Sequence, residues 1–227
     1  MYSSQWAADS AIRDYGADPS KVEVIPFGAN LDEPPSAEQV LSREPSSTCR
    51  LLFVGKDWQR KGGDIAVQTL IALNQMGIDT ELTTVGTVLP PEVKHEKLHS
   101  IAFLNKNVPA QRQQLNNLFL KSDFFIFPTR AECSPIVLCE AAAFGLPVIA
   151  SDVGGISTLV EEGKSGYVLL ASASPEDYAN VIVEILSSAK NYRHLVEGSR
   201  DRYDSRLNWQ KWAEDIHKLV LTLCESC

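Results

Sequence analysis

The chain has 227 residues, of which 44% are hydrophobic and 22% are charged, and its formal net charge at pH 7 is −8. This composition suits a globular protein with a normal core and argues against disordered or collagen-like sequences. The negative charge repels polyanions, so nucleic acid is not an expected partner and any anion site must be local. No apolar run approaches the roughly 20 residues that span a bilayer, and no leader-like segment opens the chain, so a cytoplasmic location is expected.

The first fifty residues differ in pattern from the rest of the chain. Residues 1–16 are predicted to form a helix with no strand before it, residues 22–25 a short strand, and residues 31–48 a polar connector containing Pro and Ser. A doubly wound domain would open with a glycine-bearing strand, which is found here at residues 51–55. We therefore interpret residues 1–48 as the tail of a preceding domain plus an interdomain linker.

From residue 50 onward, short β-rich runs alternate with longer stretches of helical periodicity, which is typical of a parallel sheet covered by helices. Strands are predicted at residues 50–54, 80–85, 100–103, 124–127, 147–150 and 166–169. Helices are predicted at residues 63–76, 110–120, 136–144 and 175–187, and Gly77 and Gly145 are expected to end two of them. The predicted fold class is α/β, with a Rossmann-like domain over residues 49–206 and a C-terminal crossing helix within residues 207–227.

A basic loop follows the first of these strands. Lys56, Arg60 and Lys61 place three cations within six residues of an acidic protein. In a parallel sheet such a loop faces the ligand crevice, where flexible cations can neutralise a diphosphate. The alternative is a solvated basic turn. Neither the Gly-x-Gly-x-x-Gly dinucleotide pattern nor the P-loop pattern is present, so phosphate binding must use another arrangement.

A second motif joins the fourth predicted strand to the helix after it and contains two glutamates. Glu132 lies in the loop, and Glu140 lies about a turn and a half into the helix, so both carboxylates can approach one ligand at the helix opening. The N–H groups of Ile136 and Val137 would favour a phosphate there. Glu140 interrupts an apolar segment, where an unpaired carboxylate is costly. A ligand hydroxyl or a structural ion pair with Lys or Arg would each compensate for that cost.

These motifs and the residues around them resemble the C-terminal domain of retaining glycosyltransferases of the GT-B fold, in glycosyltransferase group 1, also called family 4. The residues that carry the resemblance are Glu132-x7-Glu140, AAAFGLPVIA at residues 141–150, DVGG at residues 152–155 and EGKSGY at residues 162–167. Residues 3–6 and 24–30 are similar to the segments that connect the two domains of such enzymes. Residues 209–223 resemble the closing helix that crosses back.

The resemblance implies a role for each residue of the two motifs. Glu140 would bind the ribose hydroxyls, Glu132 the donor sugar near the reacting face, and Lys61 the diphosphate. Lys56 stands where the family usually has Arg, so Arg60 is expected to supply the bidentate phosphate contact. The expected catalytic residues are Glu132, Lys61 and Lys56, and the expected donor-binding residues are Gly55, Arg60, Cys133, Ser134, Pro135, Ile136, Val137 and Glu140. Ser134 is predicted to be the N-cap of the helix, with Pro135 at its first position.

The implied activity is that of a hexosyltransferase, which transfers a sugar from a nucleoside diphosphate to an acceptor hydroxyl with retention of anomeric configuration. The basic loop would stabilise the departing diphosphate without a metal or other cofactor. The expected partners are a nucleotide sugar and an N-terminal acceptor-binding domain that this sequence lacks. The isolated chain is therefore expected to be poorly active, and any membrane association is expected only through that domain. The alternatives are an idle nucleotide-sugar-binding module and a related GT-B epimerase or phosphorylase.

Two patterns could instead indicate a metal. Residues 95–99 match His-Glu-x-x-His, in which two His on one helical face bind zinc, but the segment leads directly into a predicted strand and leaves barely two helical turns. Cys224 and Cys227 form a Cys-x-x-Cys pair at the chain end, with no second ligand pair. The five cysteines lack the spacing of a disulfide framework, which favours reduced thiols. We therefore expect no metal site.

Overall fold

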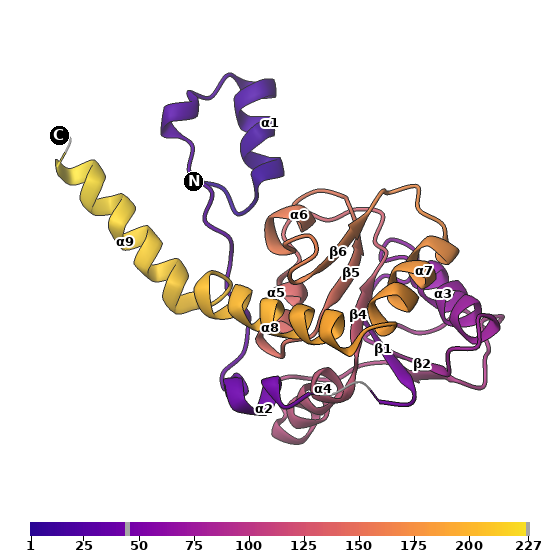
Figure 1. Ribbon diagram of the computed structural model, residues 1–227. Coiled ribbons are helices and arrows are strands. Elements are labelled where there is room, and N and C mark those ends of the chain that lie inside the picture. The colour runs from indigo at the N-terminus through magenta and orange to yellow at the C-terminus, as the bar shows by residue number, and fades with distance from the viewer. Residues whose placement is uncertain (44–45, 226–227) are drawn as a thin grey trace.

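Over residues 1–43 and 46–225, which are the residues that the computed structural model describes, the chain forms one six-stranded parallel sheet with helices on both faces (Figure 1). The strand order is β3-β2-β1-β4-β5-β6. The strands are β1 (Cys49–Val54), β2 (Thr80–Val85), β3 (Leu98–Ile101), β4 (Phe124–Phe127), β5 (Val148–Ser151) and β6 (Gly166–Leu169). In the sheet's centre Leu51 of β1 is paired with Leu82 of β2 and with Phe124 of β4. The predicted α/β Rossmann-like class is confirmed.

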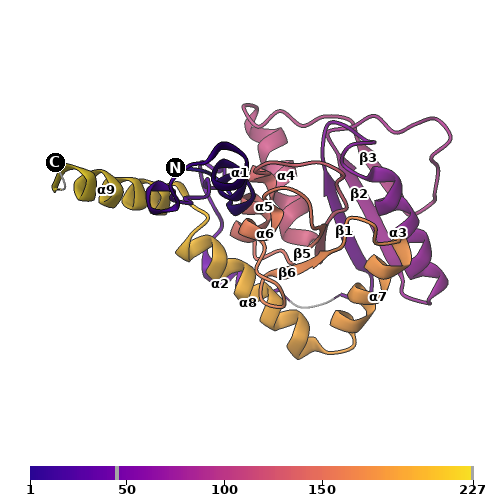
Figure 2. The same cartoon turned by 90° about the horizontal axis from the view of Figure 1, so that it is seen from above.

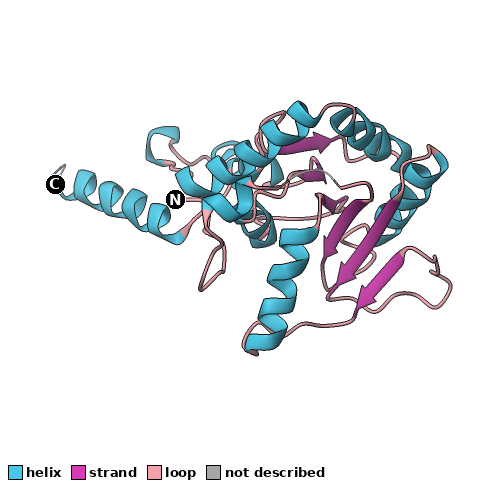
Figure 3. Cartoon of the chain, turned by 60° about the horizontal axis from the view of Figure 1, so that its bottom comes forward, coloured by secondary structure: helices cyan, strands magenta, loops and turns pink. Residues whose placement is uncertain are grey.

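Each face of the sheet has its own hydrophobic core, because successive side chains of a strand point to opposite faces. Leu51 and Phe124 pack toward the helices α3 (Gly63–Gln75) and α7 (Pro175–Leu186). Leu52 and Phe125 pack toward the helices α4 (Pro109–Lys121) and α5 (Ile136–Ala143). Figures 2 and 3 show the sheet between these helices. Burial on both faces explains why the central strands are continuous apolar runs.

The two glycines that were predicted to end helices follow helices in the structure. Gly77 and Gly145 follow α3 and α5 with φ of +83° and +57°, values that glycine adopts without strain. The first helix, α1 (Gln5–Tyr15), begins at the N-cap Ser4 and ends at Gly16. The remaining helices are η1 (Pro19–Lys21), α2 (Ala37–Leu41), α6 (Ile156–Leu159), α8 (Ala189–Ser205) and α9 (Trp209–Glu225).

The start of α5 differs from the prediction. Pro135, in an extended conformation, is the N-cap, and the helix begins at Ile136 without a side-chain cap. Ser134 is therefore not the N-cap; its hydroxyl lies 2.6 Å from the hydroxyl of Ser3 instead. That contact joins the N-terminal segment to the opening of α5.

Three further local predictions were wrong. The edge strand β3 lies two residues earlier than residues 100–103, because Leu98 pairs with Leu82 and Phe103 is 60% exposed. Residues 22–25 form only an isolated bridge, between Tyr2 and Val24. The polar connector contains α2, which is held by its buried Val40.

The N-terminal and C-terminal segments are fastened to each other beside the sheet. The guanidinium of Arg206 donates to the carbonyl of Val24 (3.2 Å), and the Ala29 N–H donates to the carbonyl of Leu207 (3.0 Å). From this junction α9 extends away from the sheet (Figures 1 and 2). The domain boundaries that we propose at residues 48 and 206 stay a prediction.

In the part of the chain that the structure describes, no helix combines the length and apolar character needed to cross a bilayer. Cys49, Cys133, Cys139 and Cys224 are free thiols. Cys227, the second member of the terminal Cys-x-x-Cys pair, lies outside the described residues.

Candidate active site

The two predicted motifs meet where the strand order reverses. From β1 the chain continues outward through β2 and β3, and then returns to place β4 on the other side of β1. In open parallel sheets, ligands bind in the crevice beside the carboxyl ends of the two strands at such a point. The basic loop (residues 55–62) follows β1, and the glutamate loop (residues 128–135) follows β4. The topology therefore brings both loops to one crevice.

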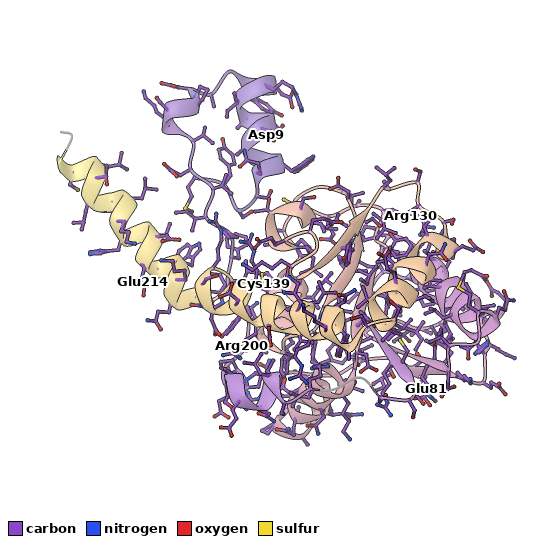
Figure 4. The ribbon with its side chains drawn as sticks, in the orientation of Figure 1. Asp9, Glu81, Arg130, Cys139, Arg200 and Glu214 are labelled. Carbon is purple, nitrogen blue, oxygen red and sulfur yellow. The ribbon has the colours of Figure 1, made fainter. Side chains whose placement is uncertain are left out.

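Hydrogen bonds join these two loops directly. The Arg130 N–H and the Thr129 hydroxyl both donate to the carbonyl of Arg60, at 2.8 and 3.0 Å. The Arg130 guanidinium, labelled at the upper right of the sheet in Figure 4, donates two hydrogen bonds of 2.8 and 2.7 Å to Asp64 of α3. These bonds from Arg130 lower the pKa of Asp64. Arg130 thus fastens the glutamate loop to the start of α3.

Glycine allows the basic loop to approach this closely. Gly62, the N-cap of α3, has a φ of +75°, and a Cβ at this residue would lie 1.9 Å from the carbonyl oxygen of Pro128. A Cβ at Gly55 would lie 2.9 Å from Cγ of Lys61. A side chain at either position would push apart the groups that hold Lys61 in place.

The crevice contains a charge cluster of Arg60, Lys61 and Glu132. The Lys61 ammonium is bonded to Oε1 of Glu132, and Nη1 of Arg60 lies 2.9 Å from the same oxygen. The side chains of Lys61 and Glu132 are only 13% and 10% exposed, whereas that of Arg60 is 44% exposed. The Lys61 ammonium also lies 4.7 Å from the ring centre of Phe127, a cation–π contact. Two cations therefore converge on one carboxylate.

Burial, followed by repulsion from Arg60, lowers the pKa of Lys61 to about 8. The Asp57 carboxylate acts in the opposite direction, because its negative charge stabilises the charged ammonium. An incoming anion with more negative charge than a carboxylate would have the same effect. The cluster is thus suited to bind an anionic ligand.

Glu140 forms a separate ion pair. Its side chain is 6% exposed, and Nζ of Lys106, in the loop after β3, lies 2.5 Å from its Oε1. Burial raises the pKa of Glu140, and the Lys106 charge opposes that rise. Both residues line a cavity of about 780 Å³, whose lining includes Asn107 and Pro109 but not the Arg60, Lys61 and Glu132 cluster. The predicted alternative of a structural ion pair is therefore present in the structure.

The other predicted residues surround the cluster. The backbone of Glu132 and Cys133 is packed against the DVGG segment, where a Cβ at Gly154 would lie 1.7 Å from the Glu132 carbonyl oxygen. Cys133 itself is exposed. Ile136 and Val137 form the first two positions of α5, whose N–H groups have no acceptor within a helix. Lys56 is exposed and lies outside the charge cluster.

The His-Glu-x-x-His pattern does not form a helix. His95 lies outside regular structure and His99 lies on β3, so the two rings do not share a helical face. Among the described residues, no group of three or more His, Cys, Asp or Glu is placed to hold a metal ion. Metal independence stays a prediction.

Comparison with known proteins decides the family. The profile of the family described as "Glycosyl transferases group 1" matches residues 48–188. The chain belongs to this family. The match includes both loops of the site, α5 and the DVGG segment.

The chain is also similar to curated proteins. The chain is 30% identical over 221 residues to a D-inositol 3-phosphate glycosyltransferase of Jonesia denitrificans. This alignment covers 89% of the chain and 51% of that protein. The chain is 31% identical over 179 residues to the spore coat protein SA of Bacillus subtilis, covering 73% of this chain and 47% of that protein. The chain thus spans about half the length of these relatives.

Solved structures share the fold. WaaG, a glycosyltransferase involved in lipopolysaccharide biosynthesis, matches with a TM-score of 0.72 at 21% identity, over 95% of this chain and 60% of WaaG. Anabaena HepE in complex with UDP matches with a TM-score of 0.73 at 17% identity, over 97% of this chain and 63% of HepE. A second HepE structure contains UDP-glucose.

Two charged residues of the candidate site were missed by the sequence analysis. Arg130 lies inside the second motif, and Lys106 follows the third strand along the chain. The carboxyl ends of parallel strands share one edge of the sheet, so a Lys or Arg that follows any of the strands was a candidate for the same site. The sequence analysis considered cations only in the loop after β1.

Proposed function

We propose that this chain forms the nucleotide-sugar-binding part of a glycosyltransferase that moves a sugar from a nucleoside diphosphate to an acceptor hydroxyl with retention of configuration. The observation that carries the proposal is the convergence of Arg60, Lys61 and Glu132 at the opening of α5, where the strand order reverses. The glycosyltransferase relatives and the UDP and UDP-glucose complexes of HepE support it.

In this proposal Lys61 and Arg60 bind the diphosphate. A diphosphate carries more charge than one carboxylate, so it competes with Glu132 for both cations. The first N–H groups of α5 and the positive end of its dipole add to the attraction. The same groups stabilise the charge that develops on the departing diphosphate. Glu132, released from part of its pairing, accepts hydrogen bonds from hydroxyls of the donor sugar.

Glu140 and its cavity would take the nucleoside. A volume of about 780 Å³ is in the range of small-molecule sites and is ample for a nucleoside. The buried carboxylate of Glu140 is an acceptor for the two ribose hydroxyls, which are both donors. The acceptor hydroxyl would be presented by a separate domain, in keeping with relatives about twice as long as this chain.

Isothermal titration calorimetry tests the proposal. UDP, GDP, ADP and UDP-glucose are titrated into the wild-type chain, Lys61→Ala and the matched control Lys94→Ala, an exposed lysine far along the chain from the cluster. We expect at least one nucleoside diphosphate to bind, Lys61→Ala to weaken it and Lys94→Ala to leave it unchanged. Added salt should weaken binding to the wild type. Absence of binding by all four ligands, or unchanged binding in Lys61→Ala, would overturn the proposal.

Retention is tested on the enzyme that includes the acceptor-binding domain. The anomeric configuration of the transferred sugar in the product is read from the coupling constant of its anomeric proton. The same configuration as in the donor is expected, and the opposite configuration would refute the retaining mechanism.

A further inference from the structure

The ion pair between Lys106 and Glu140 joins two elements that are far apart in the sheet. Lys106 follows the edge strand β3, whereas Glu140 lies on α5, which follows β4 on the other side of β1. The lysine side chain is 40% exposed, and the glutamate side chain is 6% exposed. A half-exposed cation thus reaches a buried carboxylate at the wall of the cavity.

Glu140 needs such a partner to stay ionised. It lies on a helix whose neighbouring residues are apolar, and a buried carboxylate without a counter-charge takes up a proton. A protonated carboxyl group has lost one of its acceptor sites and no longer forms charge-assisted hydrogen bonds with hydroxyls, which are roughly twice as strong as neutral ones. The value of Glu140 as a hydroxyl acceptor therefore depends on Lys106.

We propose that Lys106 is a positioning residue for nucleotide binding, which keeps the Glu140 carboxylate ionised and turned toward the cavity so that it can accept the ribose hydroxyls. The inference rests on the proposed function, because it takes the nucleoside to be the occupant of this cavity. It adds a residue that lies outside both sequence motifs.

Lys106 and a ribose can bind the same carboxylate together. Lys106 donates to Oε1 alone, and a carboxylate has about four lone-pair sites. Two hydroxyls can therefore approach the remaining sites without displacing the ammonium. Loss of Lys106 is expected to weaken nucleotide binding instead of relieving competition.

Of the other charged groups near Glu140, all but the exposed Glu33 have partners that the structure shows. These groups are Asp32 and Glu33 of the linker and Arg112 of α4 in the cavity wall, and Arg200 and Arg202 of α8, the helix packed against α5. Arg112 is paired with Asp32 at 2.6 Å. Arg200, visible with Cys139 in Figure 4, donates to the carbonyls of Pro35 and Ala143, and Arg202 donates to the carbonyl of Thr158.

Cys139, the neighbour of Glu140 on α5, is buried, and burial raises the pKa of its thiol to about 12. The thiol therefore stays neutral over the pH range of a binding experiment. Lys106 remains as the cation that compensates the charge of Glu140.

The pH dependence of binding separates this role from simple packing. The pKa of Glu140 is raised by burial and held down by Lys106. Without the lysine charge that pKa rises further, so Glu140 takes up a proton as the pH falls and binding weakens. Above the pKa the carboxylate is restored and so is binding.

The experiment measures UDP affinity by calorimetry from pH 5.5 to 8.5 for Lys106→Met, Lys106→Arg and the surface control Lys94→Met. Each affinity is divided by that of the wild type at the same pH, which cancels the titration of UDP itself. For Lys106→Met we expect a ratio within a few-fold of one at pH 8.5 and a fall of up to about tenfold per pH unit below the pKa of Glu140, which levels off near the loss seen for Glu140→Gln. Lys106→Arg and Lys94→Met should stay flat. A flat ratio for a folded Lys106→Met would overturn the inference.

Glu140→Gln separates failure of this inference from failure of the proposed function. If Glu140→Gln leaves UDP affinity unchanged, Glu140 does not bind the nucleotide and its proposed role fails. If Glu140→Gln weakens UDP while Lys106→Met follows the wild type, only the role of Lys106 fails. In the Glu140→Gln background, Lys106→Met should show no added pH dependence, and a dependence that persists there would overturn the inference.

Discussion

Replacing Gly62 by Ala tests whether a close backbone approach holds the two loops of the site together. An alanine would have to adopt a φ of +75°, which costs about 1–2 kcal/mol. Its Cβ would also lie 1.9 Å from the carbonyl oxygen of Pro128, so the backbone must shift, at about 1–3 kcal/mol more. We expect Gly62→Ala to lower the free energy of unfolding by about 2–5 kcal/mol, measured by urea denaturation.

Gly77→Ala is the matched control. Gly77 has a φ of +83°, and a Cβ there would meet no atom within 4 Å. The free energy of unfolding should therefore fall only by the cost of backbone strain, about 1–2 kcal/mol. UDP affinity should fall in Gly62→Ala, because Lys61 is displaced, and should be unchanged in Gly77→Ala. Equal losses of stability in the two variants, with equal UDP binding, would refute the close contact between the loops.

Three other predictions concern the charges of the site. UDP affinity should fall as the pH rises through about 8, because the pKa of Lys61 is lowered to about 8 and the neutral amine no longer attracts the diphosphate; Lys61→Arg should remove this fall in calorimetry from pH 7 to 9.5, and a flat wild-type profile would contradict it. EDTA should leave UDP binding unchanged, whereas binding that is lost and then restored by Mg²⁺ would show a metal requirement. Lys56→Ala should weaken UDP binding less than Lys61→Ala in parallel titrations, since Lys56 is exposed outside the cluster; the reverse order would restore Lys56 to the catalytic group.

Much of the sheet could be predicted because its central strands are buried on both faces. The bounds of β2 and β4 agree with their apolar or β-branched runs. The edge strand β3 could not be placed, since its residues are partly exposed and its register depends on pairing with β2. The short helix α2 could not be predicted from its polar segment, because it is stabilised by the burial of Val40 and the segment has no hydrophobic periodicity.

The site was predictable to the extent that topology brings its loops together. Consecutive motifs after β1 and β4 had to meet once the strand order was right, and Lys61 and Glu132 do meet. The partner of Glu140 was not predictable, because the reach of Lys106 depends on the path of the loop after β3. The hydroxyl contact between Ser3 and Ser134 spans 131 residues, and neither local sequence contains a sign of it.

The most direct test of the proposed donor site compares the two glutamates. UDP and UDP-glucose are titrated into folded Glu132→Gln and Glu140→Gln. A charge-assisted hydrogen bond contributes roughly 1.5–3 kcal/mol, so Glu140→Gln should lower the affinity for both ligands about tenfold or more. Glu132→Gln should keep or increase UDP affinity, because its carboxylate no longer competes for Lys61 and Arg60, and should lower the affinity for UDP-glucose relative to UDP. Equal loss of UDP binding in the two variants would contradict the assignment of Glu140 to the ribose and Glu132 to the sugar.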